Sequence, residues 1–215
     1  MGKVELNPRL TGQAPGYSLG CGVCPNTPQM LPAQLHLTLP LWLRDSIDAS
    51  RLYTDDEARV TLAIELALGN VENRSGGPFG AAVFTGEGRL VSVGVNRVVP
   101  QSCSVAHAEV MAYMLAQQRL QRFRLNEGGE KFVLATSAQP CCQCYGATMW
   151  AGIDELLIGA RSEDVEELTE FDEGPLPADW IGELEKRGVR VKRDILREPA
   201  RAVFLRYREL GGTAY

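Results

Sequence analysis

The sequence predicts a single α/β domain, a three-layer α/β/α sandwich whose central mixed sheet has about five strands. Two observations predict it. Segments with helical periodicity alternate with short β-branched runs in the order α-β-β-α-β-α-β-α-β-α. The chain has 215 residues, of which 45% are hydrophobic, and this is enough to bury one core. One strand pair is joined by a tight hairpin and later strands follow helices, so the sheet should be mixed.

The first fifty residues differ in composition from the rest. Residues 1–50 are rich in proline and glycine, and their apolar runs are short. We therefore expect an extended, weakly structured arm, followed by one domain over residues 51–215. Cys21 and Cys24 form a lone C-x-x-C pair within the arm, and a lone pair favours an incidental thiol pair over a second metal site.

The ordered part begins near Thr54, which has capping-box spacing with Glu57. Apolar residues then recur every four positions, and this predicts a helix to about Gly69. The other expected elements are strands over residues 80–85, 89–95, 132–136, 156–158 and 189–191, and helices over residues 106–122, 141–151 and 199–210.

Charge and hydropathy exclude several classes of protein. The 22 basic and 27 acidic residues give a net charge of −5, whereas proteins that hold a long polyanion present a basic face. Nucleic acid is therefore disfavoured as the main substrate. The sequence contains no apolar run of about 18 residues and no secretory signal pattern, so we expect a cytoplasmic protein without a membrane span.

His107, Cys141 and Cys144 form a pattern of potential zinc ligands. The two cysteines are spaced i,i+3 at a predicted helix start, so both thiolates can face one metal ion, and the helix N-terminus favours the thiolate form. Three protein ligands leave a fourth position for water, as in catalytic zinc sites. Glu109 lies two residues after the histidine, where it can reach that water. A structural site would need a fourth ligand, for which Cys103 is the local alternative.

The histidine and cysteine motifs resemble the signature of the zinc-dependent cytidine deaminase superfamily. The matching residues are His-Ala-Glu at 107–109 and Pro-Cys-Cys-Gln-Cys at 140–144. Within the superfamily the chain is most similar to bacterial guanine deaminases, over roughly residues 55–210. This closer resemblance lies in residues 77–80, 96–100, 106–109 and 171–174. One departure is Gln139, where many relatives have glutamate.

The resemblance implies hydrolytic deamination of a free nucleobase, most simply guanine to xanthine plus ammonia. In this chemistry Zn²⁺ lowers the pKa of its bound water from about 15.7 toward 7, and Glu109 relays protons between water, ring nitrogen and departing amine. The resemblance also implies a homodimer that acts on a small molecule. Such an enzyme would be a zinc-dependent hydrolase of a cyclic amidine C–N bond.

Four further residues are expected near the substrate. By resemblance, Asn96, Phe79 and Ala108 bind the base and Glu173 assists proton transfer. Each has a simpler structural interpretation. Asn96 could end a strand in a turn, Phe79 could pack in the core, and Glu173 could belong to the solvated acidic stretch of residues 154–173.

Other functions stay open at this stage. The motif is compatible with deamination of cytosine, a nucleoside or a triazine such as ammeline, and with a tRNA adenosine deaminase or a zinc-stabilised binding module. The sequence also leaves open whether the tail, residues 211–215, covers an active site.

Overall fold

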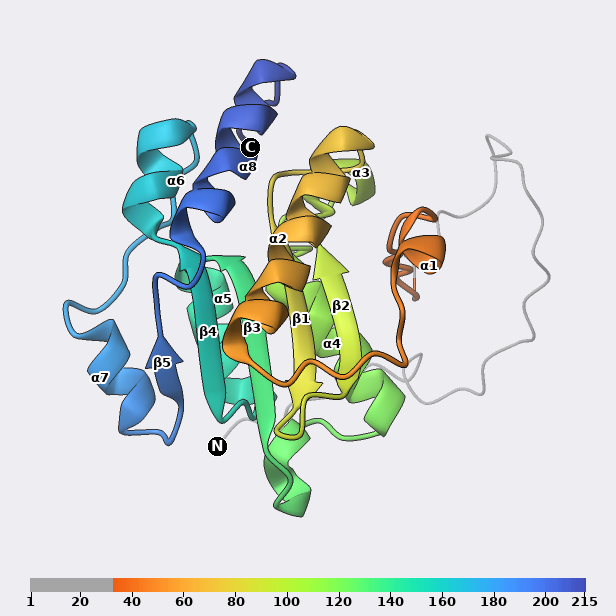
Figure 1. The fold of residues 1–215 in the computed structure, drawn as a ribbon, viewed down its shortest axis with the longest axis vertical. Coiled ribbons are helices and arrows are strands. Elements are labelled where there is room, and N and C mark those ends of the chain that lie inside the picture. Colours follow the sequence, from red (N-terminus) through yellow and green to blue (C-terminus); the bar gives the residue numbers. More distant parts are fainter. Residues whose placement is uncertain (1–32) are drawn as a thin grey trace, which may run out of the picture. The chain divides into compact units, whose positions relative to one another are not determined.

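A five-stranded mixed sheet forms the centre of the domain (Figure 1). The computed structural model describes residues 33–215. The strand order is β2-β1-β3-β4-β5, in which β1 pairs antiparallel with β2 and β3, while β3-β4 and β4-β5 are parallel. The strands are β1 (Gly80–Thr85), β2 (Leu90–Val95), β3 (Phe132–Ala138), β4 (Glu155–Ala160) and β5 (Arg190–Lys192). The predicted mixed sheet of about five strands is confirmed.

Helices cover both faces of this sheet, which makes the domain a three-layer sandwich (Figure 1). Helices α2 (Asp56–Glu72) and α8 (Arg197–Glu209) cover one face, and α4 (Ala108–Leu120) and α5 (Cys142–Ala151) cover the other. Each face buries its own apolar cluster against the sheet. The shorter helices are α1 (Leu43–Ser46), α3 (Val98–Gln101), the 3₁₀ turn η2 (Leu125–Gly128), α6 (Ser162–Leu168) and α7 (Trp180–Glu185).

Helix α2 differs from its prediction at both ends. Asp55 is the N-cap, and its carboxylate accepts a hydrogen bond from the N–H of Ala58 at 2.7 Å, so the predicted capping box of Thr54 and Glu57 is wrong. The helix also continues past Gly69. Gly69 lies against the Trp42 ring, where a Cβ would come within 2.6 Å of the indole, so this glycine allows close packing and does not end the helix.

The region between β4 and β5 holds two helices, α6 and α7, where one was expected. Asp164 of α6 is 1% exposed and accepts hydrogen bonds from Arg197 at 2.7 Å and from Arg201. These ion pairs bind α6 to α8 and neutralise part of the acidic stretch that the sequence shows here.

The compact unit that holds the sheet runs from Leu37 to Tyr215. Residues 37–50, assigned to the arm from composition, therefore pack with the domain. Cys21 and Cys24 lie outside the described residues. Among the residues that are described, no helix is long and apolar enough to cross a membrane.

Candidate metal centre and active site

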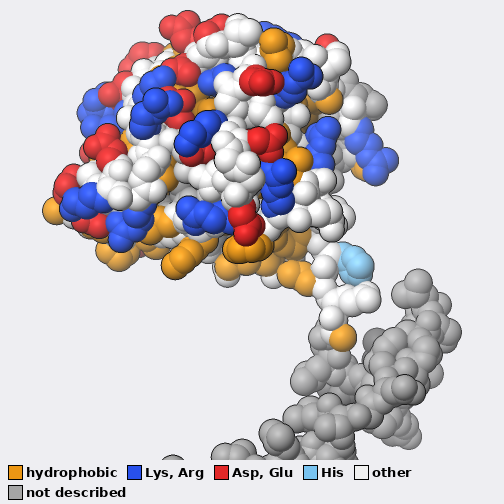
Figure 2. Space-filling view, turned by 90° about the horizontal axis from the view of Figure 1, so that it is seen from below, with side chains coloured by type: hydrophobic (Ala, Val, Ile, Leu, Met, Phe, Trp, Pro, Cys, Tyr) orange, Lys and Arg blue, Asp and Glu red, His pale blue; other side chains and the backbone are white. Residues whose placement is uncertain are grey.

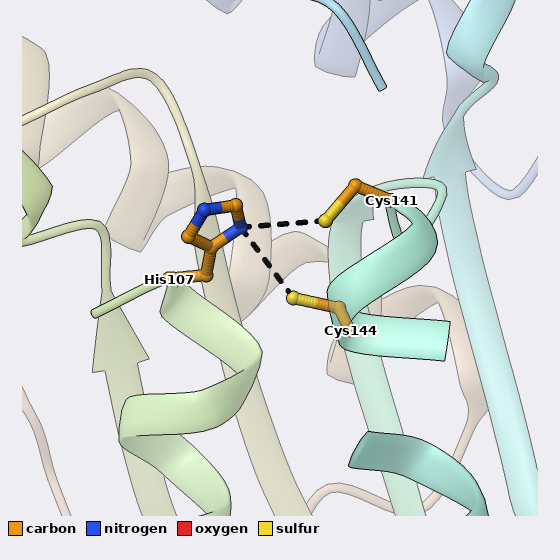
Figure 3. Close-up of side chains that lie close together, drawn as sticks. All are labelled: His107, Cys141 and Cys144. Carbon is orange, nitrogen blue, oxygen red and sulfur yellow. Dashed lines mark hydrogen bonds between the residues drawn. The ribbon is translucent and has the colours of Figure 1, made fainter. Parts of the chain in front are cut away.

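The three predicted metal ligands converge from two helix starts (Figure 3). His107 is the N-cap of α4 and Cys141 is the N-cap of α5, with Cys144 one turn further along. The Nδ1 atom of His107 lies 3.4 Å from the Cys141 sulfur and 3.6 Å from the Cys144 sulfur. All three ligand atoms lie within 4.8 Å of one another, although 34 positions separate the histidine from the first cysteine.

These distances fit zinc. Tetrahedral zinc with Zn–S near 2.3 Å and Zn–N near 2.0–2.1 Å places nitrogen and sulfur roughly 3.6 Å apart. Cys103 does not join the cluster, which contains three ligand side chains among the described residues. Three protein ligands leave the fourth coordination position of zinc open for water, as in catalytic zinc sites. His107, Cys141 and Cys144 are thus positioned to bind a metal ion.

The two cysteine thiols are strongly coupled. A hydrogen bond from Cys144 lowers the pKa of Cys141 to about 4, despite the opposing effect of burial. The same bond raises the pKa of Cys144, together with burial. This shift favours the thiolate form of Cys141, and thiolate is the form that binds zinc.

Two carboxylates lie beside the metal ligands. Glu109, in the first turn of α4, is 6% exposed, and Glu173, in the loop after α6, is 7% exposed. Burial raises the pKa of Glu109 to about 7, with a further contribution from Cys141. Burial likewise raises the pKa of Glu173 to about 8, with contributions from Cys141 and Glu109. Glu173 is therefore not the solvated surface residue that its acidic neighbourhood suggested.

A cavity of about 190 Å³ holds these groups together. Its lining residues are Phe79, Asn96, Val98, Ser104, His107, Glu109, Gln139, Cys141, Phe171, Asp172, Glu173 and Tyr215. A larger hollow of about 780 Å³ lies at the opposite ends of β3 and β4, lined mainly by charged residues. We place the chemistry in the smaller cavity, because two of the three metal ligands, His107 and Cys141, line it together with Glu109 and Glu173.

Asn96 closes a turn and also lines the cavity. Its side-chain oxygen accepts hydrogen bonds from the backbone N–H of Gly77 at 3.4 Å and of Val98 at 3.2 Å, so it closes the turn after β2. The same side chain lines the cavity. With the oxygen held by the backbone, the amide NH₂ is the group left to meet a ligand.

The two other predicted binding residues differ in position. Phe79 lines the cavity and also packs edge-on against Phe171, with ring centroids 5.3 Å apart, and its contact with a substrate stays a prediction. Ala108 is fully buried, and its carbonyl oxygen packs closely against Gly94 of β2. Its side chain is not part of the cavity lining, and a substrate contact by Ala108 stays a prediction.

Two aromatic residues complete the cavity without having been predicted as binding residues. The rings of Phe171 and Tyr215 meet edge-on with centroids 4.9 Å apart. Phe171 stands in a segment that carries the resemblance, which was the available signal. Tyr215 was unassigned within the tail. Its position shows that residues 211–215 reach the cavity of their own chain.

Gln139 also lines the cavity, where many relatives carry glutamate. It is 4% exposed and donates a hydrogen bond to the Ser162 hydroxyl at 3.1 Å. Its buried Oε1 has no hydrogen-bond partner within the described part of the chain. Glutamine at position 139 therefore affects a contact with α6 and does not affect the metal ligands.

A three-ligand metal cluster beside two buried carboxylates defines a metal-dependent hydrolytic enzyme. Residues 53–160 match the family described as the cytidine and deoxycytidylate deaminase zinc-binding region. The chain belongs to this deaminase family, and zinc is the metal that its three ligands are positioned to hold.

Individual relatives show which kinds of deaminase the chain is similar to. The solved structure of guanine deaminase from Nitrosomonas europaea is 41% identical, covers 84% of this chain and all of its own, and superposes with a TM-score of 0.78. Guanine deaminase from Bacillus subtilis is 35% identical over 105 residues, which are 49% of this chain and 64% of that enzyme. The match therefore spans just under two thirds of the enzyme's length. A tRNA-specific adenosine deaminase from Buchnera aphidicola is 30% identical over 120 residues, 56% of this chain and 72% of that enzyme.

Proposed function

We propose that this protein is a guanine deaminase, which converts guanine and water to xanthine and ammonia. The observation that carries the proposal is the pair of buried carboxylates, Glu109 and Glu173, facing the metal ligands in one small cavity. A zinc-dependent deamination needs protons moved at two places, from the attacking water and to the departing amine. The similarity to the guanine deaminase from Nitrosomonas europaea, which covers 84% of the chain, supports this assignment.

Four residues of the cavity have a part in the proposed reaction. Zinc, when bound, activates water as a nucleophile at neutral pH. Glu109 accepts a proton from the attacking water and delivers it to the ring nitrogen beside the reacting carbon. Glu173 assists proton transfer to the amine as ammonia leaves. The Asn96 amide donates to an acceptor on the edge of the base, and Phe79 contacts the ring.

The size of the cavity favours a free base over larger substrates. Its volume of about 190 Å³ is below the ~300–1,000 Å³ of pockets for drug-sized ligands. A purine base is small and planar, whereas a nucleotide adds a sugar and a phosphate. The three acidic side chains that line the cavity, Glu109, Asp172 and Glu173, also disfavour a phosphate group. A tRNA substrate is the main alternative in view of the adenosine deaminase relative, but the net charge of −5 does not favour a polyanion.

An ammonia-release assay tests the proposal. Zinc-loaded protein is incubated with guanine, cytosine, cytidine, ammeline and a tRNA, and ammonia is measured for each. We expect turnover of guanine at a kcat/KM at least tenfold above that of every other substrate. Guanine that stays intact while another compound releases ammonia would overturn the substrate assignment. No ammonia from any of them would overturn the enzymatic function.

We also propose that the protein is a cytoplasmic homodimer that acts in purine metabolism. Hydrophobic side chains gather along the edge of the domain that α4 and α5 form (Figure 2). The large exposed residues here are Val105, Met114, Phe123 and Trp150, and the last two are 78% and 77% exposed. A patch of this kind marks an interaction surface. Sedimentation equilibrium should give a dimer, and Trp150→Glu should shift it toward monomer. A monomeric wild-type protein would contradict the assignment.

A further inference from the structure

Asn70 of α2 lies behind the segments that line the cavity, and both the nitrogen and the oxygen of its side-chain amide have hydrogen-bond partners. It is completely buried, and its NH₂ group donates to the carbonyl oxygens of Gly77 at 2.8 Å and Asn96 at 2.9 Å. Its side-chain oxygen accepts a hydrogen bond from the Ser75 hydroxyl at 2.7 Å. Both N–H groups of the amide are therefore used, and they join the two segments that form one wall of the cavity.

The two segments lie in close contact with each other. Gly76 lies against the carbonyl of Asn96, where a Cβ would come within 1.9 Å of the oxygen. The neighbouring Gly77 donates its N–H to the side-chain oxygen of Asn96. Because Asn70 holds the carbonyl of Gly77, the donor that orients the Asn96 side chain is itself placed by Asn70.

A second layer of contacts reaches Asn70 from residues 38–42. The indole N–H of Trp42 donates to the Ser75 hydroxyl at 2.9 Å, and that hydroxyl donates to Asn70. Arg97 donates to the carbonyl oxygens of Ser75 and of Thr38, the latter at 3.1 Å. Thr38 and Trp42 precede residues 53–160, the part that matches the family.

We propose that Asn70 is a positioning residue for substrate binding, and that Trp42 holds it in place through Ser75. The inference rests on the proposed function only in taking Asn96 as a substrate contact. In this arrangement the segment before the deaminase motif supports the cavity, and its loss alters affinity for the base more than the chemical step.

Kinetics of matched variants test the positioning role. Asn70→Ala and Trp42→Phe should each raise KM for guanine, on the order of tenfold for Asn70→Ala, while kcat and zinc content change little, because the metal and both carboxylates are untouched. The controls are Asn73→Ala, which removes a hydrogen bond from the exposed C-cap of the same helix to the carbonyl of Gly69, and Trp180→Phe, a partly buried tryptophan of α7. Both should keep the wild-type KM. A wild-type KM in the Trp42→Phe variant would overturn the proposal, even where Asn70→Ala does not fold.

A double-mutant cycle separates positioning from general destabilisation. If Asn70 acts through Asn96, adding Asn70→Ala to Asn96→Ala should raise KM no further than Asn96→Ala alone. Additive effects would mean that Asn70 acts by another route, and would overturn the proposal.

Amide hydrogen exchange supplies a readout that needs no substrate. In the Trp42→Phe variant the N–H groups of Gly77 and Val98 should exchange several-fold faster than in the wild type, because their acceptor on Asn96 is less firmly held. Unchanged exchange at both amides would overturn the proposal. A wild-type protein inactive on guanine would instead contradict the proposed function, and the exchange result would still decide this inference.

Discussion

The backbone N–H of Cys142 donates a hydrogen bond to the carbonyl oxygen of Glu173 at 2.9 Å. This bond docks the loop that carries the second carboxylate onto the helix start that carries the metal-binding cysteines. Cys142, which does not belong to the metal cluster, thus lies at the junction between the two halves of the site. The Cys142 sulfur also packs against Gly174, the next residue of the loop.

We expect Gly174→Ala to displace this loop. Gly174 has φ of +68°, and a Cβ there would lie 2.6 Å from the Cys142 sulfur. The backbone conformation costs about 1 kcal/mol for alanine, and the close contact adds to it. Gly188→Ala is the matched control, since Gly188 has φ of +83° and no atom near its Cβ position. Gly174→Ala should lose more stability and more activity than the control in thermal melts and assays. Equal losses would show that the sulfur contact is unimportant.

Glu109→Gln should bind zinc and fold normally but lose turnover. Glutamine keeps the volume of the side chain and cannot exchange a proton, so kcat should fall roughly 10²–10⁴-fold. Zinc per chain, measured by mass spectrometry, should stay at the wild-type value. The exposed Glu163 provides the control, because Glu163→Gln should be fully active. Near-normal activity of Glu109→Gln would contradict its role as proton carrier.

Glu173→Gln tests the second carboxylate. We expect kcat to fall by at least about tenfold, because the departing amine loses a proton donor. Glu170→Gln, an exposed change in the same acidic segment, should have no effect. If Glu173→Gln matched Glu170→Gln in both kcat and KM, Glu173 would be only a structural residue.

Removing the metal should destabilise the domain. The thiol groups of Cys141 and Cys144 are buried, so without a cation they remain a coupled pair at the junction of α4 and α5. A chelator should lower the melting temperature by several degrees, and added zinc should restore it. Cys144→Ala should abolish this response, whereas Cys142→Ala should keep it. A melting temperature indifferent to chelation would argue against bound zinc.

The ion pairs of Asp164 predict an acid-sensitive contact between α6 and α8. Hydrogen bonds from Arg197 lower the pKa of Asp164 to about 2 from an ordinary value of 3.8. A lowered pKa stabilises the folded state above pH 4, and this contribution is lost as the pH falls from about 4 to 2. Asp164→Asn should therefore cost about 2 kcal/mol of unfolding free energy at pH 7. The difference from wild type, measured by urea denaturation, should shrink at pH 3. A constant difference would contradict the assigned pKa.

Much of the site could be predicted from the sequence because its chemistry is local. The i,i+3 spacing of Cys141 and Cys144 at a helix start already aims two thiolates at one point. The placement of Glu109 two residues after His107 likewise needs only a first helical turn. All five strands were predicted, since β-branched runs bounded by turns identify them, but β3 and β4 extend beyond the predicted residues 132–136 and 156–158.

Other features depend on contacts distant in sequence. The composition of residues 37–50 suggests an arm, but Trp42 packs on Gly69 and hydrogen-bonds to Ser75, and nothing local indicates either contact. Asp55 caps α2 in place of the predicted Thr54, because neighbouring polar residues are similarly suited to the N-cap position and the sequence does not distinguish them. The resemblance pointed to Glu173 while the composition of its segment suggested a solvated residue, and its burial decides between the two interpretations.

The sequence by itself determined the fold class and the candidate metal ligands, because these depend on short periodic patterns and on donor atoms at fixed spacing, and its resemblance to a known family indicated the kind of reaction. The tertiary structure decided which polar residues are buried away from solvent. It buried Glu173 and Asn70, brought Tyr215 to the cavity, and closed the turn that orients Asn96. Burial depends on how distant segments pack together, and no local pattern encodes it.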